Sequence, residues 1–106
     1  MSAIEETLQR IERASNVTGF VILDNAGNVL RYRTDMGEEN ARLLATCFKP
    51  LLERSLSAVR DLDPTDTLNF LRVRMRELEV MAAPGPGFVI VVTQRWWPTD
   101  WPVGKV

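Results

Sequence analysis

A change of hydrophobic period within residues 59–75 is the feature that most constrains the fold of this chain. The residues up to Leu62 follow a helical pattern, and Pro64 disfavours helical geometry at Asp63, so a helix is predicted to end there. From Thr67 onward the period is two, which predicts a strand over residues 67–75. One face of that strand carries Leu68, Phe70, Arg72, Arg74 and Arg76, and the other carries Leu71, Val73 and Met75.

This predicted strand is apolar on both faces through its first half, whereas an ordinary half-buried strand is apolar on one face only. Leu68 and Phe70 therefore need cover from a second layer or from a second chain. We expect the strand at an edge of the sheet, where its unpaired backbone groups can template another strand. A symmetric dimer would meet both needs at once.

Periodicity and turn residues predict the other elements. The long helix over residues 38–62 contains Pro50, whose ring crowds the carbonyl of Thr46, so we expect a kink or break there. Ser2 and Glu5 form a capping box for a first helix. The expected segments are a helix over 3–14, strands over 17–23, 29–33, 78–83 and 88–94, a turn at 24–27 and a turn at 84–87.

These elements predict a mixed α/β sandwich, in which a largely antiparallel five-stranded sheet carries a short N-terminal helix and one long helix between its second and third strands. We expect one domain over residues 1–94 and a tail over 95–106 that contains Trp96, Trp97 and Trp101. Tryptophans are costly to leave in water, so they either anchor an interface or fold back over the sheet or the first helix.

Composition limits the classes of partner. Thirteen basic and fourteen acidic side chains leave a formal charge of −1, which does not favour nucleic acid or an anionic membrane as partner. One cysteine fits a reducing compartment, and no apolar run approaches the roughly 20 residues that span a bilayer. We also find no signal-peptide core, so a cytoplasmic protein is expected.

The residue types give no catalytic or metal site. The chain has no histidine, so Cys/His zinc sites and Ser–His or Cys–His pairs are excluded. Cys47 is predicted to pack inside the protein. Asp61, Asp63 and Asp66 lack the spacing of a calcium loop, and Asp66 is predicted to cap or close a turn. We therefore expect no cofactor and no enzyme activity, with an unknown small enzyme as a remote alternative.

Arg72, Arg74 and Arg76 alternate along the predicted strand and make a basic stripe. A solvated strand edge protected by charge is the first interpretation. The acidic segment of a protein partner is the second, and nucleic acid is the third because no aromatic residues alternate with the arginines.

The segments VRDLDP at 59–64, LNFLRVR at 68–74, EVMAAP at 79–84 and FVIVVTQ at 88–94 resemble the roadblock family of dynein light chains. The resemblance extends over residues 4–94 and is long and specific. It implies a non-catalytic homodimer that binds the dynein intermediate chain, with a paralogous light chain as an alternative second protomer. A cytoplasmic, cytoskeletal location is implied, with the axoneme of a cilium or flagellum as one setting.

The resemblance also assigns sites. In such light chains the third strand pairs across the two-fold axis and the long helices pack together. The implied dimer interface comprises Leu68, Phe70, Leu71, Arg72, Val73, Arg74, Met75, Phe48, Leu52, Ser55 and Val59. The residues predicted to bind the partner are Ile4, Leu8, Ile11, Trp96, Trp97 and Trp101.

The long helix with Pro50 and the tryptophan-rich tail depart from common members of the family. The alternative function is regulation or scaffolding of small Ras-like GTPases, as in related modules of the superfamily. In that role Arg60, Arg72 or Arg74 would contact nucleotide or switch loops.

Overall fold

The computed structural model describes residues 3–13 and 16–96, and it has one five-stranded sheet with the order β2-β1-β5-β4-β3. Every neighbouring pair of strands is antiparallel, as the fold class predicted from the sequence requires. The elements are α1 (Ala3–Arg13), β1 (Val17–Leu23), β2 (Val29–Tyr32), the short 3-10 helix η1 (Thr34–Met36), α2 (Glu38–Leu62), β3 (Leu71–Arg74), β4 (Leu78–Gly85) and β5 (Phe88–Arg95).

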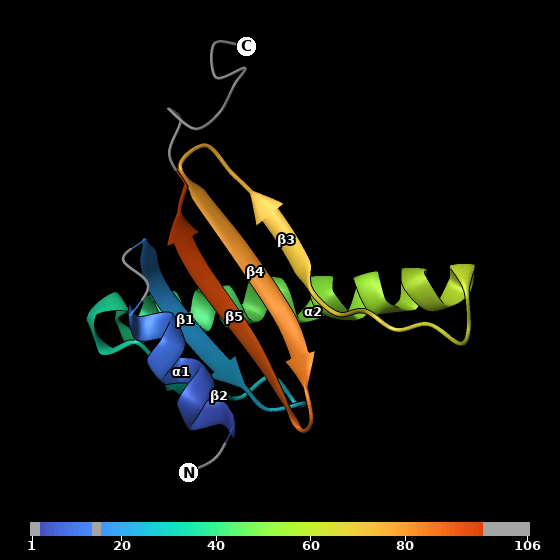
Figure 1. The fold of residues 1–106 in the computed structure, drawn as a ribbon, viewed down its shortest axis with the longest axis horizontal. Coiled ribbons are helices and arrows are strands. Elements are labelled where there is room, and N and C mark those ends of the chain that lie inside the picture. Colours follow the sequence, from blue (N-terminus) through green and yellow to red (C-terminus); the bar gives the residue numbers. More distant parts are fainter. Residues whose placement is uncertain (1–2, 14–15, 97–106) are drawn as a thin grey trace.

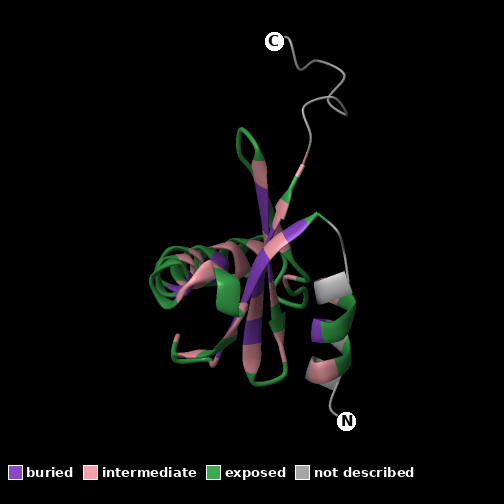
Figure 2. Cartoon of the chain, turned by 90° about the vertical axis from the view of Figure 1, so that its left-hand side faces the viewer, coloured by how far each residue is buried: buried purple, intermediate pink, exposed green. Residues whose placement is uncertain are grey.

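The two helices cover opposite faces of the sheet (Figures 1 and 2). Side chains of the central strands alternate between these faces, so each face has its own apolar cluster. The cluster under α2 is built on Val21, Leu23, Ala41, Ala45, Leu52, Val80, Ala82, Val89 and Val91. The smaller cluster under α1 is built on Leu8, Val17, Phe20, Ile22 and Val92.

Both predicted tight turns are present, with one change of extent. Asp24 accepts hydrogen bonds from the backbone N–H groups of Ala26 and Asn28, and Gly27 takes the positive φ of 93° that closes the β1–β2 turn. The β4–β5 turn is narrower than predicted, because Pro84 and Gly85 pair with Val89 and Phe88 within the ladder.

α2 runs through Pro50 without a break, so the sequence-based prediction is wrong as far as a break is concerned. Pro50 and Thr46 are both exposed. The carbonyl that loses its intrahelical partner at this position therefore lies on the solvent side of the helix, where water can replace the missing donor.

β3 is shorter than the predicted strand over 67–75, and Pro84 supplies the physical reason. In an antiparallel ladder, hydrogen-bonded pairs recur at every second residue. Met75 N–H donates to the Leu78 carbonyl, so the residues of β3 that exchange hydrogen bonds with β4 are Val73 and Leu71. Continuing that register places Asn69 opposite Pro84, which has no N–H to donate. The ladder therefore stops at Leu71.

Leu68 consequently lies outside the strand and packs against the cluster under α2, not on the face of Phe70 as predicted. The segment before β3 follows a turn built by aspartate side chains. Asp63 accepts hydrogen bonds from the N–H and hydroxyl of Thr65, which lower its pKa, and Asp66 accepts one from the N–H of Thr67. The prediction that Asp66 closes a turn is confirmed.

A buried carboxylate, Glu79, ties β3 to β4 and β5 on the α1 face. Glu79 is 1% exposed, Gln94 donates to it at 2.7 Å and Arg74 donates at 3.0 Å. Arg72 lies 3.7 Å from the same carboxylate. Arg72 and Arg74 therefore each contact a buried carboxylate within the fold. Neither the solvated strand edge nor the partner-binding stripe predicted from the sequence includes this contact.

The pKa of Glu79 reflects opposing effects. Burial disfavours the charged form and raises the pKa, but the hydrogen bonds from Gln94 and Arg74 and the charges of Arg72 and Arg74 outweigh burial and lower it below 4.5. The ionised form of Glu79 therefore stabilises the folded state.

Replacing Pro50 by alanine should stabilise the protein, because the helix already continues through this position and would gain a backbone hydrogen bond without changing its path. We expect the free energy of unfolding to rise by up to about 3 kcal/mol. Urea denaturation at a fixed protein concentration measures the change, with Pro64→Ala, outside the helix, as the matched comparison. A less stable Pro50→Ala protein would show that the proline is needed for packing.

Glu79→Gln should lower the free energy of unfolding by about 2 kcal/mol at pH 7, since hydrogen bonds to a charged group are lost. The lowered pKa means that this stabilisation is complete above pH 4.5 and disappears as the pH falls through the folded-state pKa. The difference between the wild type and Glu79→Gln should therefore shrink below pH 4.5 in urea denaturation series. A difference that stayed constant down to about pH 3 would contradict the assigned role.

Candidate functional site

β3 forms one edge of the sheet and presents an open backbone edge to its surroundings. In an antiparallel ladder, residues that do not exchange hydrogen bonds with the neighbouring strand point their N–H and C=O groups the other way. The hydrogen bond from Met75 to Leu78 sets this alternation, so the backbone groups of Arg72 face away from β4. The predicted edge position is confirmed.

Large apolar side chains surround this open edge. Phe70 is 55% exposed just before β3 on the α1 face, Met75 follows the strand, and Leu71 and Val73 are half-buried. Arg72 lies over the Phe70 ring at 5.7 Å from its centroid. The edge strand therefore combines open backbone with uncovered apolar surface, which natural monomers usually avoid.

The second half of α2 extends past the sheet beside β3 (Figure 1). Leu62 at its end is 88% exposed, and Leu51 is also exposed. Val59 and Ser55 are half-buried, and the Ser55 hydroxyl donates to the Leu51 carbonyl. Among the helix residues assigned to the dimer interface, Leu52 is 4% exposed in the core and Phe48 packs against it. Leu52 therefore has little surface left for a partner, whereas Phe48 is half-buried.

Cys47 is exposed on α2, so its predicted packing role is wrong. The buried face of the helix is set by Ala41, Ala45 and Leu52, and position 47 falls outside it. Leu43, one turn before Cys47, is exposed on the same side.

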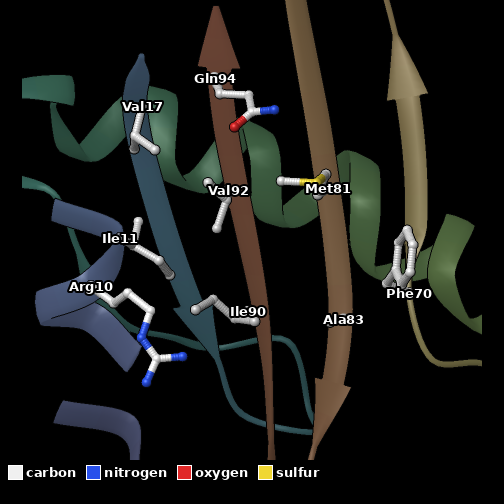
Figure 3. Close-up of a pocket in the computed structure, with 9 residues that line it drawn as sticks. All are labelled: Arg10, Ile11, Val17, Phe70, Met81, Ala83, Ile90, Val92 and Gln94. Carbon is white, nitrogen blue, oxygen red and sulfur yellow. The ribbon is translucent and has the colours of Figure 1, made fainter. Parts of the chain in front are cut away.

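An apolar groove lies on the α1 face of the sheet, between α1 and β3 (Figure 3). Its volume is about 360 Å³. Arg10 and Ile11 come from α1 at one side, and Phe70 stands beside β3 at the other. The floor between them is formed by strand residues: Val17, Met81, Ala83, Ile90, Val92 and Gln94.

Sequence reasoning missed this groove. The signal was present in the alternation of β4 and β5, which places Met81, Ile90 and Val92 on the face opposite α2. One short helix cannot cover the width of a five-stranded sheet, so part of that row stays open.

The residues predicted to bind a partner divide into three groups. Leu8 of α1 is buried against the sheet and Ile11 is half-buried at the groove. The sheet therefore already covers most of the apolar face of α1. Trp96 folds back, as its indole N–H donates to the Met75 carbonyl at 2.8 Å and its ring faces Arg74 at 4.5 Å. The side chain of Ile4, together with Trp97 and Trp101, lies outside the described residues, as do the Ser2 cap and Ala14.

Within residues 3–13 and 16–96, no group of three or more histidine, cysteine, aspartate or glutamate side chains could hold a metal ion. No helix in this described part of the chain is long and apolar enough to cross a membrane. What the described surface offers is an open strand edge, an exposed helix end and an apolar groove, which are features of protein–protein recognition.

Comparison with solved structures places the same fold in bacterial proteins. A roadblock/LC7 domain from Streptomyces avermitilis has a TM-score of 0.75 at 17% identity, over 83% of this chain and 73% of that chain. The gliding protein MglB from Thermus thermophilus has a TM-score of 0.69 at 17% identity, over 96% and 76%. A structure described as MglB with a tetrameric arrangement has a TM-score of 0.68 at 17% identity, over 96% and 75%.

At such identities these structures show a shared fold. The family itself is shown by the sequence comparison, because the model of the Roadblock/LC7 domain matches residues 3–94. That range holds every helix and all but the last residue of the strands described above. The chain belongs to the Roadblock/LC7 domain family.

Proposed function

We propose that this chain is a non-catalytic subunit that works as a homodimer, joined through β3 and α2. The observation that carries the proposal is the open β3 edge, flanked by apolar side chains that the rest of residues 3–13 and 16–96 leaves uncovered. Pairing with a second copy would satisfy the outward backbone groups of Arg72 and cover Phe70, Met75 and Leu62.

The charge arrangement is compatible with self-pairing. Two antiparallel β3 strands would bring arginines of both copies close to the two-fold axis, where like charges repel. Glu79 lies within ion-pair distance of Arg72 and Arg74 in each copy and offsets much of that repulsion. On the opposite face, the overhanging end of α2 would meet its counterpart, with Val59 and Ser55 between them.

Within this dimer, the proposed role is that of a dynein light chain that binds the dynein intermediate chain. The segments at 59–64 and 68–74 support this role by their resemblance to roadblock light chains. A paralogous light chain would be able to replace one protomer. The proposed location is the cytoplasm, on the cytoskeleton, with the axoneme of a cilium or flagellum as one setting.

A second candidate is a regulator or scaffold of small Ras-like GTPases. It is compatible with the similarity of the fold to bacterial roadblock proteins, one of which is the gliding protein MglB from Thermus thermophilus. The two candidates share the proposed dimer and differ in the partner that it holds.

Arg72→Pro should abolish dimerisation and leave the monomer folded, because it removes an N–H that faces away from β4. Wild-type protein should sediment as a dimer at micromolar concentration, and the variant should sediment as a monomer with an unchanged circular dichroism spectrum. Arg72→Ala is the matched control, since it also loses the contact with Glu79 but keeps the backbone donor. A monomeric wild type, or equal dissociation constants for both variants, would contradict pairing through β3.

The partner assignment is tested with purified protein from the source organism. We expect the dimer to retain the dynein intermediate chain in a pull-down and to leave GTP hydrolysis by small GTPases unchanged. Retention should weaken in Arg72→Pro, since a monomer presents half of the surface. Accelerated GTP hydrolysis without retention of the intermediate chain would favour the second candidate.

A further inference from the structure

The apolar groove beside α1 and the segment that follows β5 meet at one end of the sheet (Figure 3). Gln94, the lining residue nearest the end of β5, lies two residues before Trp96, the last residue that the structure describes. We infer that residues 97–106 fold back into this groove and close it within the same chain, as an intramolecular plug. The inference does not depend on the proposed dimer or on its partner.

Trp96 directs the chain toward the groove side of the sheet. In an extended chain, residues two apart share a face, so Trp96 follows Gln94 on the α1 face. The ring of Trp96 faces Arg74 at 4.5 Å, and its indole N–H donates to the Met75 carbonyl. The segment after Trp96 therefore starts beside the end of the groove, on the face that the groove occupies.

The sequence after Trp96 is suited to reverse the chain and to follow the groove. The residues WPTD at 97–100 have proline at the second position and polar residues after it, a composition typical of a β-turn. The six residues 101–106 that follow span roughly 19 Å at about 3.1 Å per residue. From Gln94 to Ile90 the groove extends over four residues of β5, which is roughly 14 Å. The segment is long enough to fill it.

The chemistry of the segment matches the floor. The polar residue of the floor, Gln94, already donates to Glu79, so a polar occupant would find few groups to orient it. The segment WPVGKV is apolar at four of its six positions, which are Trp101, Pro102, Val103 and Val106. Trp101 brings a side chain that buries roughly 150–250 Å². Pro102 has no N–H to leave unpaired on an apolar floor, and its fixed φ reduces the entropy lost on ordering.

Covalent attachment favours this occupant over a free apolar segment. A short tether gives an effective concentration on the order of 1 mM. If residues 97–106 bind as a free peptide with a dissociation constant of about 0.1 mM, the attached segment fills the groove about nine-tenths of the time. Access to the apolar floor then requires displacement of the plug.

Met81 on the groove floor reports the plug through its rate of oxidation by dilute peroxide in the full chain. Trp101→Asp places a charge on the apolar floor and should release the segment. We expect Met81 to be oxidised at least about fivefold faster in Trp101→Asp than in the wild type, because thioether oxidation follows exposure. Thr99→Asp adds the same charge in the predicted turn and should keep the wild-type rate. Equal rates in the wild type and Trp101→Asp would overturn the inference.

A labelled peptide with the sequence of residues 97–106 tests the same contact by fluorescence anisotropy. It should bind Trp101→Asp about tenfold more tightly than the wild type, whose own segment leaves about one-tenth of the grooves free. Adding Met81→Lys to Trp101→Asp should weaken that binding by at least about tenfold. Leu30→Lys is the matched addition, since Leu30 is an exposed apolar residue outside the groove. Equal binding to the wild type and Trp101→Asp, or no binding to either, would contradict the plug.

The two variants of Arg72 separate this inference from the proposed dimer. Both lose the contact of Arg72 with the Met81 sulfur, but only Arg72→Pro loses the outward N–H. Trp101→Asp should accelerate Met81 oxidation by the same factor in Arg72→Pro and Arg72→Ala, at every protein concentration, because plug and groove belong to one chain. Loss of the acceleration in Arg72→Pro would show that a second copy supplies the segment. If Arg72→Pro stays dimeric and Met81 stays protected, the plug stands and pairing through β3 is wrong.

Discussion

The central strands of this domain are apolar on both faces, and every other feature of the structure responds to the need to cover them. β5 directs Val89 and Val91 toward α2 and Ile90 and Val92 toward α1. α2 is long enough to cross the whole sheet and extends past it, whereas α1 covers only the β1 side of its face (Figures 1 and 2). The uncovered remainder is the groove beside β3, and it exists because the described part of the chain has one long α-helix and one short one.

Hydrogen bonds and ion pairs around Glu79 hold together the part of the sheet that α1 does not cover. Because α1 does not reach this side, Glu79 is shielded by Arg72, Arg74 and Gln94, which supply the hydrogen bonds and charges that a buried carboxylate needs. Trp96 extends this network by closing over Arg74 after the end of β5. These polar side chains therefore stabilise β3 through contacts with β4 and β5. They leave the backbone groups on the outer edge of β3 unobstructed.

The sequence predicted most of the fold because local signals and tertiary needs agree along much of the chain. The period-two runs of β1 and β5, the aspartate turn after β1 and the helical pattern over α2 each match the observed element. The exceptions have specific causes. Pro50 is tolerated because Thr46 faces solvent, and β3 is short because Pro84 on the neighbouring strand cannot donate to Asn69.

For the candidate site, the sequence by itself determined that residues 70–75 would need cover beyond a single helix, since alternation shows which side chains share a face. Tertiary structure alone decided that Cys47 is exposed, that the arginines of β3 meet Glu79, and that a groove opens beside α1. These outcomes depend on strand order and helix placement. The physical reason is that a periodic pattern fixes the faces of an element but not which neighbour covers each face.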